Sequence, residues 1–169
     1  MTSLLVLGGA RSGKSAYAQK RCEALGQRLV YIATAYPGDD EMADRIARHR
    51  ADRGPCWSTI EAQVDLCGAI ADAMQRADAV LVDCLTLWLS NLMLGDHDIG
   101  AARDELVRIV RQAPVPLIMI ANEVGMGIVP DNALARRFRD EAGWMNQAIA
   151  AAAKEVVMVA AGLPITLKA

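Results

Sequence analysis

The octet Gly8-Gly9-Ala10-Arg11-Ser12-Gly13-Lys14-Ser15 directly follows the apolar run Leu4-Leu5-Val6-Leu7. It matches the phosphate-binding pattern G-x-x-x-x-G-K-[ST] at every fixed position. The pattern is typical of a buried strand that leads into a glycine-rich turn, whose amides surround phosphate oxygens, and then into a helix whose N-terminal dipole attracts the anion. Glycines that only form a turn would explain neither the lysine nor the hydroxyl. These residues therefore predict a strand, a phosphate loop and a helix in succession.

Two side chains of the octet have specific tasks in such a loop. Lys14 is placed to reach the β- and γ-phosphates of a nucleotide. Ser15 places a hydroxyl where it can ligate the Mg²⁺ ion that bridges those phosphates. We therefore predict that Lys14 is catalytic and that Ser15 binds magnesium. The other predicted nucleotide contacts of the octet are Gly8, Gly9, Ala10, Arg11, Ser12 and Gly13.

The composition suits a single nucleotide-binding domain over residues 1–169. A chain of 169 residues with 53% hydrophobic composition can bury a full core. The 18 basic and 20 acidic residues give a net charge of −2 without a basic stripe, so we expect no nucleic-acid partner. Four scattered cysteines without a C-x-x-C pair favour reduced thiols and the cytoplasm. We expect neither a signal peptide nor a membrane span.

Predicted strands alternate with predicted helices, an order typical of a largely parallel sheet covered on both faces. Strands are expected at residues 3–7, 28–33, 58–60, 79–82, 116–121 and 155–160, and the run 164–167 should pair antiparallel after the turn Ala161-Gly162. Helices are expected at residues 14–25, 63–76, 85–94, 99–112 and 132–152. Gly26 is predicted to cap the first helix in a left-handed conformation. Another helix should open at Asp39-Asp40-Glu41, whose acids oppose the helix dipole.

An aspartate follows the apolar strand Ala79-Val80-Leu81-Val82. At the carboxyl edge of a parallel sheet, where ligands of open α/β folds bind, Asp83 would hold Mg²⁺ opposite the Ser15 hydroxyl. The alternative is that Asp83 caps the helix beginning at Cys84 or Leu85. The intact phosphate loop earlier in the chain favours the magnesium site.

Glu123 follows another predicted strand in the same way. It belongs to the segment Asn122-Glu123-Val124-Gly125-Met126-Gly127-Ile128-Val129-Pro130, which is too rich in glycine to be ordinary core. Such a loop at the carboxyl end of a strand could close over a substrate. Equally, it could be a connection whose glycines only permit a turn.

A histidine lies among four arginines in the stretch Arg45-Ile46-Ala47-Arg48-His49-Arg50-Ala51-Asp52-Arg53. Neighbouring guanidinium groups favour the neutral, nucleophilic imidazole and could bind a triphosphate. From the residues alone, a solvated basic helix face is the more frequent explanation of such a run. The other histidine, His97, follows Gly95-Asp96 without a supporting motif and is predicted to be a surface residue.

Together these motifs resemble the bifunctional adenosylcobinamide kinase and adenosylcobinamide-phosphate guanylyltransferase family of cobalamin biosynthesis. The resemblance spans nearly the whole chain and is most specific in the tract from Arg45 to His49 and in the segment from Asn122 to Pro130. Further segments that carry it are Tyr31-Ile32-Ala33-Thr34-Ala35, Asp40-Glu41-Met42, Trp57-Ser58-Thr59-Ile60-Glu61, Asp83-Cys84-Leu85-Thr86 and Ala135-Arg136-Arg137-Phe138-Arg139-Asp140 with the region of Asn146.

The resemblance implies a cytoplasmic P-loop NTPase with a RecA-like sheet, acting twice on one corrinoid. ATP or GTP first phosphorylates adenosylcobinamide, and GTP then gives GMP to that phosphate through a guanylylated histidine, forming adenosylcobinamide-GDP and pyrophosphate. His49 matches the position of that nucleophile. The further nucleotide contacts it implies are Ala33, Thr34, Ala35, Arg50, Ala51, Asp52, Arg53, Glu61 and Asp83. It also implies a homo-oligomer, with a trimer as our expectation.

Two other functions remain open at this stage. A kinase with a single activity would need Lys14 and Ser15 but would tolerate His49→Ala. A nucleotide switch without catalysis would bind GTP tightly, turn it over slowly and ignore the corrinoid. Neither explains both the His49 tract and the segment from Asn122 to Pro130.

Overall fold

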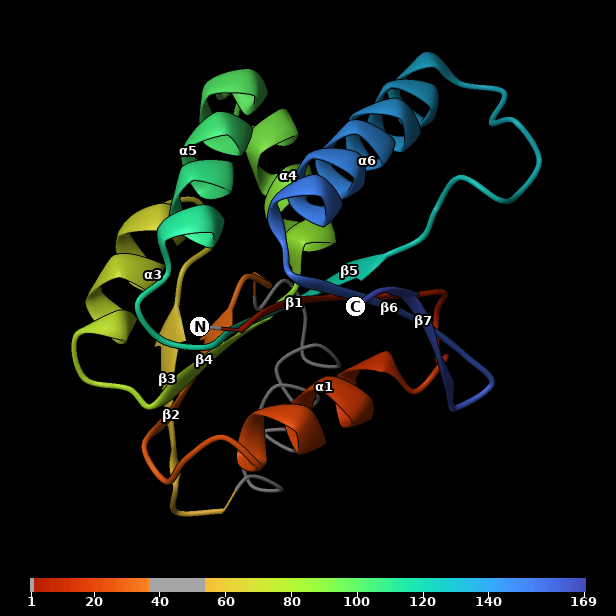
Figure 1. The fold of residues 1–169 in the computed structure, drawn as a ribbon. Coiled ribbons are helices and arrows are strands. Elements are labelled where there is room, and N and C mark those ends of the chain that lie inside the picture. Colours follow the sequence, from red (N-terminus) through yellow and green to blue (C-terminus); the bar gives the residue numbers. More distant parts are fainter. Residues whose placement is uncertain (1, 37–53) are drawn as a thin grey trace.

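Short runs of Val, Ile, Leu and Ala pair into one seven-stranded sheet in the computed structural model, which describes residues 2–36 and 54–169 (Figure 1). The strands are β1 (Ser3–Gly8), β2 (Leu29–Ala33), β3 (Trp57–Glu61), β4 (Ala79–Asp83), β5 (Leu117–Asn122), β6 (Glu155–Ala160) and β7 (Leu163–Lys168). Their spatial order is β3-β2-β4-β5-β1-β6-β7. Every neighbouring pair is parallel except β6 and β7.

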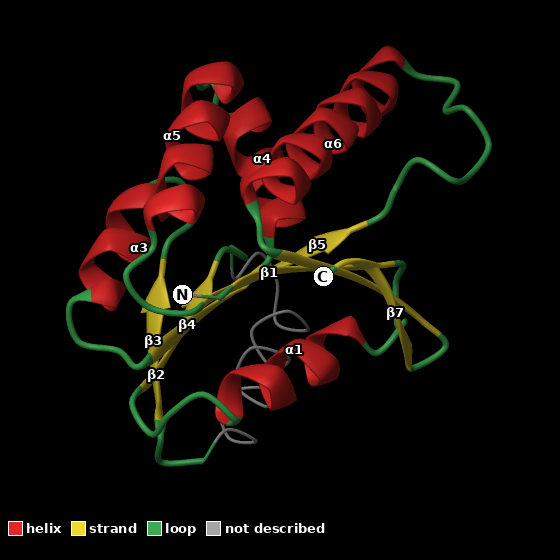
Figure 2. Ribbon diagram, viewed as in Figure 1, coloured by secondary structure: helices red, strands yellow, loops and turns green. Residues whose placement is uncertain are grey.

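Helices cover both faces of this sheet (Figure 2). Helix α1 (Lys14–Glu23) lies on one face. The other face carries α3 (Leu66–Met74), α4 (Leu85–Leu94), α5 (Ile99–Gln112) and α6 (Ala133–Ala152). Such double coverage makes the central strands apolar on both sides, and every residue of β1 is buried.

The alternation of side chains along β1 separates two apolar cores. Leu4 and Val6 pack with α1 residues such as Ala18, whereas Leu5 and Leu7 belong to the larger core under α3, α4, α5 and α6. Successive side chains of a strand point to opposite faces, so one strand contributes to both cores. This placement holds β1, and the loop that follows it, at the centre of the fold.

Polar side chains begin three of the helices. Asp65 accepts a hydrogen bond from Gly68 N, Asp98 from Ala101 N and Asn132 from Ala135 N. Each side chain thereby satisfies an amide that has no partner within its own helix.

The predicted α/β architecture is confirmed, including the antiparallel pairing of the last strand. One local prediction is wrong: Gly26 does not adopt a left-handed conformation, and α1 ends at Glu23 with Ala24 as its C-cap. A Cβ at Gly26 would lie 2.3 Å from Asp78 Cβ, so glycine allows this turn to pack against the residue preceding β4. The helix predicted to open at Asp39 lies outside the described residues.

Candidate active site

The phosphate loop lies between the central strand β1 and helix α1. Gly13, the residue before Lys14, has a φ of 93°, a conformation that residues with a side chain rarely adopt. A Cβ at Gly8 would lie 2.4 Å from Ser12 Oγ and 2.7 Å from Val159 O. Backbone geometry therefore requires glycine at both of these positions of the pattern.

The loop is electrostatically suited to an anion. Lys14 Nζ donates a hydrogen bond to Gly9 O at 3.0 Å, which keeps the ammonium group against the loop backbone. The positive N-terminal end of α1 begins at the same point. Ser15 lies in the first turn of this helix and is half-buried. Ser12 Oγ is buried and has no hydrogen-bond partner within residues 2–36 and 54–169.

The β6–β7 turn supports the phosphate loop from one side. Gly162 N donates to Ser12 O at 2.8 Å. A Cβ at Gly13 would lie 3.2 Å from Gly162 Cα, so the two backbones approach closely. This contact could not be predicted from the sequence, because the pair Ala161-Gly162 shows only that a turn occurs and not what the turn contacts.

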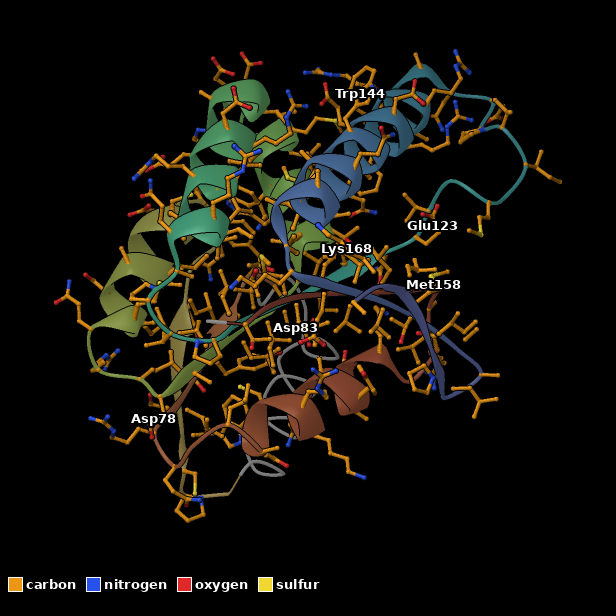
Figure 3. The ribbon with its side chains drawn as sticks, viewed as in Figure 1. Asp78, Asp83, Glu123, Trp144, Met158 and Lys168 are labelled. Carbon is orange, nitrogen blue, oxygen red and sulfur yellow. The ribbon has the colours of Figure 1, made fainter. Side chains whose placement is uncertain are left out.

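Asp83 lies at the carboxyl end of β4, between the sheet and α1 in the view of Figure 3, and Glu123 follows the neighbouring strand β5. The register partner of Asp83 on β2 is Ala33, which also pairs with Glu61 on β3. These three residues, all predicted nucleotide contacts, therefore lie side by side at the carboxyl edge of the sheet. Tyr31 Oη donates to Asp83 Oδ2 at 3.1 Å. The N-cap residue of α4 is Cys84, so Asp83 does not have the alternative role of helix cap.

Thr34 connects the ends of β2 and β4. Its buried hydroxyl donates to Cys84 O at 2.7 Å and accepts from Cys84 N at 2.8 Å, while Asn91 Nδ2 donates to Thr34 O at 2.8 Å. These bonds fix the turn that carries Asp83. Whether Thr34 and the neighbouring Ala35 also contact a nucleotide stays a prediction.

Asn122 and Glu123 leave β5 directly beside the phosphate loop. Asn122 is the register partner of Gly8, and Glu123 N donates to Gly8 O at 3.1 Å. The backbone of Asn122 is held by Thr86 Oγ1, which accepts from its N–H at 2.7 Å, and by Asn146 Nδ2, which donates to its carbonyl at 3.3 Å. The sequence analysis assigned no role to Thr86 or Asn146, which act here through the backbone.

Three of the cysteines have buried thiols that are unreactive near neutral pH. Burial raises the pKa of the Cys22 and Cys67 thiols to about 12, and it also raises the pKa of Cys84, next to Asp83. A thiol reacts and binds metals as the thiolate. These three side chains therefore remain protonated near neutral pH and supply no nucleophile.

The chain has two histidines, of which only His97 lies in the described residues. His97 is exposed in the turn between α4 and α5, where its amide donates to Leu92 O, and its predicted surface position is confirmed. His49 lies outside the described residues, as do Arg50, Ala51, Asp52 and Arg53.

No three His, Cys, Asp or Glu side chains gather as a metal cage in the described ranges. Oxygen ligands from Ser15 and Asp83 would fit a Mg²⁺ ion that takes most of its ligands from phosphates and water. Among the helices of those ranges, none combines the length and apolar character that crossing a membrane requires.

Sequence comparison places the chain among known proteins. Residues 4–167 match the family described as cobinamide kinase / cobinamide phosphate guanyltransferase. The chain belongs to this family. A bifunctional adenosylcobalamin biosynthesis protein, CobP, from Pseudomonas aeruginosa is 45% identical over 166 residues, covering 97% of this chain and 96% of that protein. The protein CobU of Escherichia coli strain K12, which has the same functional description, is 40% identical over 180 residues, covering 98% and 99%.

Solved structures with low sequence identity support the same P-loop fold. An ATPase of a bacterial type III secretion system superposes with a TM-score of 0.63 at 10% identity, covering 98% of this chain and 56% of the ATPase. The flagellar accessory protein FlaH of Methanocaldococcus jannaschii gives a TM-score of 0.55 at 14% identity, covering 99% and 78%. These two likenesses concern the fold alone, a mostly parallel sheet covered by helices.

Proposed function

We propose that this chain phosphorylates adenosylcobinamide and then transfers GMP to the product, giving adenosylcobinamide-GDP. The observation that carries the proposal is the complete phosphate loop, with Lys14 held over Gly9 O, in a chain that matches the family over residues 4–167. The names of the two curated relatives, each called bifunctional, support both activities.

In the kinase step, the hydroxyl oxygen of the corrinoid attacks the γ-phosphorus of ATP or GTP. The bond from that phosphorus to the β-bridging oxygen breaks, the nucleoside diphosphate leaves, and the hydroxyl proton goes to solvent. Lys14 and the loop amides stabilise the negative charge on the phosphate oxygens and hold the nucleotide in line. Ser15 and Asp83 would hold a Mg²⁺ ion, which would supply further neutralisation of the phosphate charge.

In the guanylyl step, a ring nitrogen of His49 attacks the α-phosphorus of GTP and pyrophosphate leaves. A phosphate oxygen of adenosylcobinamide phosphate then attacks the same phosphorus, and the P–N bond breaks to restore the imidazole. A covalent intermediate divides one displacement into two easier ones. The predicted contacts Ala33, Thr34, Ala35, Arg50, Ala51, Asp52, Arg53 and Glu61 would hold the nucleotide in these steps.

Labelling with GTP tests the nucleophile. Wild type incubated with magnesium and α-phosphate-labelled GTP should retain label after denaturation, and the label should be acid-labile and alkali-stable. His49→Ala should retain none while still phosphorylating adenosylcobinamide. The matched control is His97→Ala, which changes the other of the chain's two histidines and should be labelled like wild type.

Three results would contradict this assignment. Equal labelling of wild type and His49→Ala would place the nucleophile elsewhere. Absence of label on wild type, with corrinoid phosphorylation intact, would leave a kinase with one activity. Tight GTP binding without either reaction would instead indicate a nucleotide switch.

A further inference from the structure

The segment between β5 and α6, residues 123–132, presents apolar side chains to solvent and is called the β5–α6 loop below. Met126 is 82% exposed, Ile128 98% and Val129 63%. Figure 1 shows this loop projecting beyond the end of β5 before α6 begins. Single exposed apolar residues are common, but a cluster of them beside a reaction site indicates a binding surface.

Both ends of the β5–α6 loop are held by hydrogen bonds. At its start, Glu123 N donates to Gly8 O at 3.1 Å, and Glu123 Oε1 accepts from Gly125 N at 2.6 Å. At its end, Arg136 Nη1 donates to the carbonyls of Pro130 and Asp131 at 2.9 and 2.7 Å. The root of the loop at Glu123 is therefore held beside the phosphate loop, while its apolar middle projects beyond the end of β5 (Figure 1).

The glycines of the loop are not explained by turn geometry. Gly125 and Gly127 do not adopt a positive φ. A Cβ at Gly127 would meet nothing within 4 Å, and one at Gly125 would lie 3.0 Å from Glu123 Oε1. The contact with Glu123 accounts for Gly125, whereas Gly127 leaves open space in which a ligand can approach the backbone closely. This observation favours the substrate-loop hypothesis over a plain connection.

The β5–α6 loop begins beside the phosphate loop, where the acceptor molecule of a phosphate transfer must lie. An acceptor hydroxyl must come within contact distance of the terminal phosphate beside Lys14. β1 has two neighbours in the sheet, and on the β6 side the Gly162 turn already contacts the phosphate loop. On the β5 side the chain continues into the β5–α6 loop. The bulk of an acceptor molecule can therefore lie along this loop while its hydroxyl reaches the phosphate.

A buried polar atom at the root of the loop also lacks a partner. Asn122 Oδ1 accepts no hydrogen bond from the residues that the structure describes. Buried polar atoms are normally satisfied, and an exception needs a cause such as an absent ligand. A donor on the acceptor molecule, such as an amide N–H, would satisfy it.

We propose that the β5–α6 loop binds the corrinoid macrocycle of cobinamide, with Met126, Ile128 and Val129 against its apolar surface and Asn122 near its amide-bearing rim. The inference rests on the proposed function, because the loop is assigned to the acceptor of that reaction. A corrin ring is wide, bears methyl groups and is surrounded by amide side chains, a combination that matches an apolar loop with a polar root.

The test is the double variant Met126→Ser/Ile128→Ser. We expect its KM for cobinamide to rise at least tenfold, with kcat and the Kd for a fluorescent GTP analogue within twofold of wild type. Leu94→Ser is the matched control, because Leu94 is 70% exposed at the end of α4, which rises away from the sheet (Figure 1). All three constants of this control should stay within twofold.

The outcomes separate the inference from the function on which it rests. An unchanged KM in the double variant overturns the inference, and so does a changed oligomeric mass with unchanged KM, which would make the loop a contact between copies. If the double variant also loses GTP binding, the single variant Ile128→Ser is measured in its place. Its KM for cobinamide should rise at least threefold, and an unchanged KM overturns the inference. If wild type does not phosphorylate cobinamide, the proposed function fails. Equilibrium dialysis of cobinamide then decides the inference: weaker binding to the variant supports it, and equal or absent binding overturns it.

Discussion

At the residue scale, Asp78 holds together two turns that are distant in the sequence. Its carboxylate accepts from Gln27 N and Arg28 N at 3.0 and 2.9 Å, and from Arg28 Nε and Nη2 at 3.0 and 2.6 Å. The hydrogen bonds from the Arg28 side chain, followed by those from the backbone amides, lower the pKa of Asp78 from 3.8 to about 2. These bonds, with the close approach of Gly26, fix where β2 begins relative to β4.

The lowered pKa predicts how Asp78→Asn acts at different pH values. The folded pKa lies below the unfolded one, so the stabilisation by the carboxylate is complete above the ordinary value of 3.8 and is lost as pH falls toward about 2. We expect the variant to unfold at a lower urea concentration than wild type, by a constant margin from neutral pH down to about pH 5 and by a shrinking margin below pH 4. Urea titrations at several pH values measure it, with Asp72→Asn on α3 as control. A margin that grows on acidification would contradict the prediction.

At the element scale, the β6–β7 hairpin forms one edge of the sheet and also supports the phosphate loop. Its turn places two consecutive residues at positive φ, Ala161 at 51° and Gly162 at 79°. Two-residue hairpin turns of this hand favour Asn-Gly or Gly-Gly, because an L side chain at positive φ is strained. The Gly162 amide then bonds to Ser12 O.

This arrangement predicts opposite effects for two neighbouring substitutions. Gly162→Ala adds a side chain at a left-handed position and should lower the free energy of unfolding by about 1 kcal/mol. Since it also disturbs the bond to Ser12, it should weaken GTP binding several-fold. Ala161→Gly removes the same kind of strain and should stabilise by about 0.5 kcal/mol with unchanged GTP binding. Urea unfolding and titration with a fluorescent GTP analogue check both. Equal GTP affinity in the two variants would contradict the support role.

Local patterns predicted the elements well because they report local physics. Apolar runs, caps and the Ala161-Gly162 turn located the strands and most helices within a few residues, and the octet located the phosphate loop. The wrong cap at Gly26 depended on Asp78, far along the chain. The bonds of Thr34 to Cys84 and of Gly162 to Ser12 are tertiary contacts too, so the sequence alone could not show them. The role of His49 as the nucleophile stays a prediction.

At the scale of the whole molecule, the sheet ends on an edge strand with an apolar stripe. All of β7 is exposed, including Leu163 at 69%, Ile165 at 52% and Leu167 at 59%, and Leu167 lies at a register shift between β6 and β7. Ile165 and Leu163 are the register partners of Met158 and Ala160 on β6. Met158, labelled in Figure 3, packs against the larger core, so the stripe formed by Leu163 and Ile165 extends that face of the sheet outward. Lys168 Nζ donates to the carbonyls of Ala150, Ala151 and Ala153 and ties the end of the strand to α6.

An exposed apolar edge strand favours association unless another surface covers it. Since the homo-oligomer that the family resemblance implies would need an apolar surface, we predict that the β7 stripe contributes to it. Ile165→Lys should then reduce the mass measured by light scattering after size-exclusion chromatography to that of one chain, because a buried unpaired ammonium group is costly. Thr166→Lys, on the opposite face of the same strand, should keep the wild-type mass. A wild type that already runs as one chain would refute the homo-oligomer itself. If Ile165→Lys keeps the oligomeric mass of wild type, the interface between copies does not include β7.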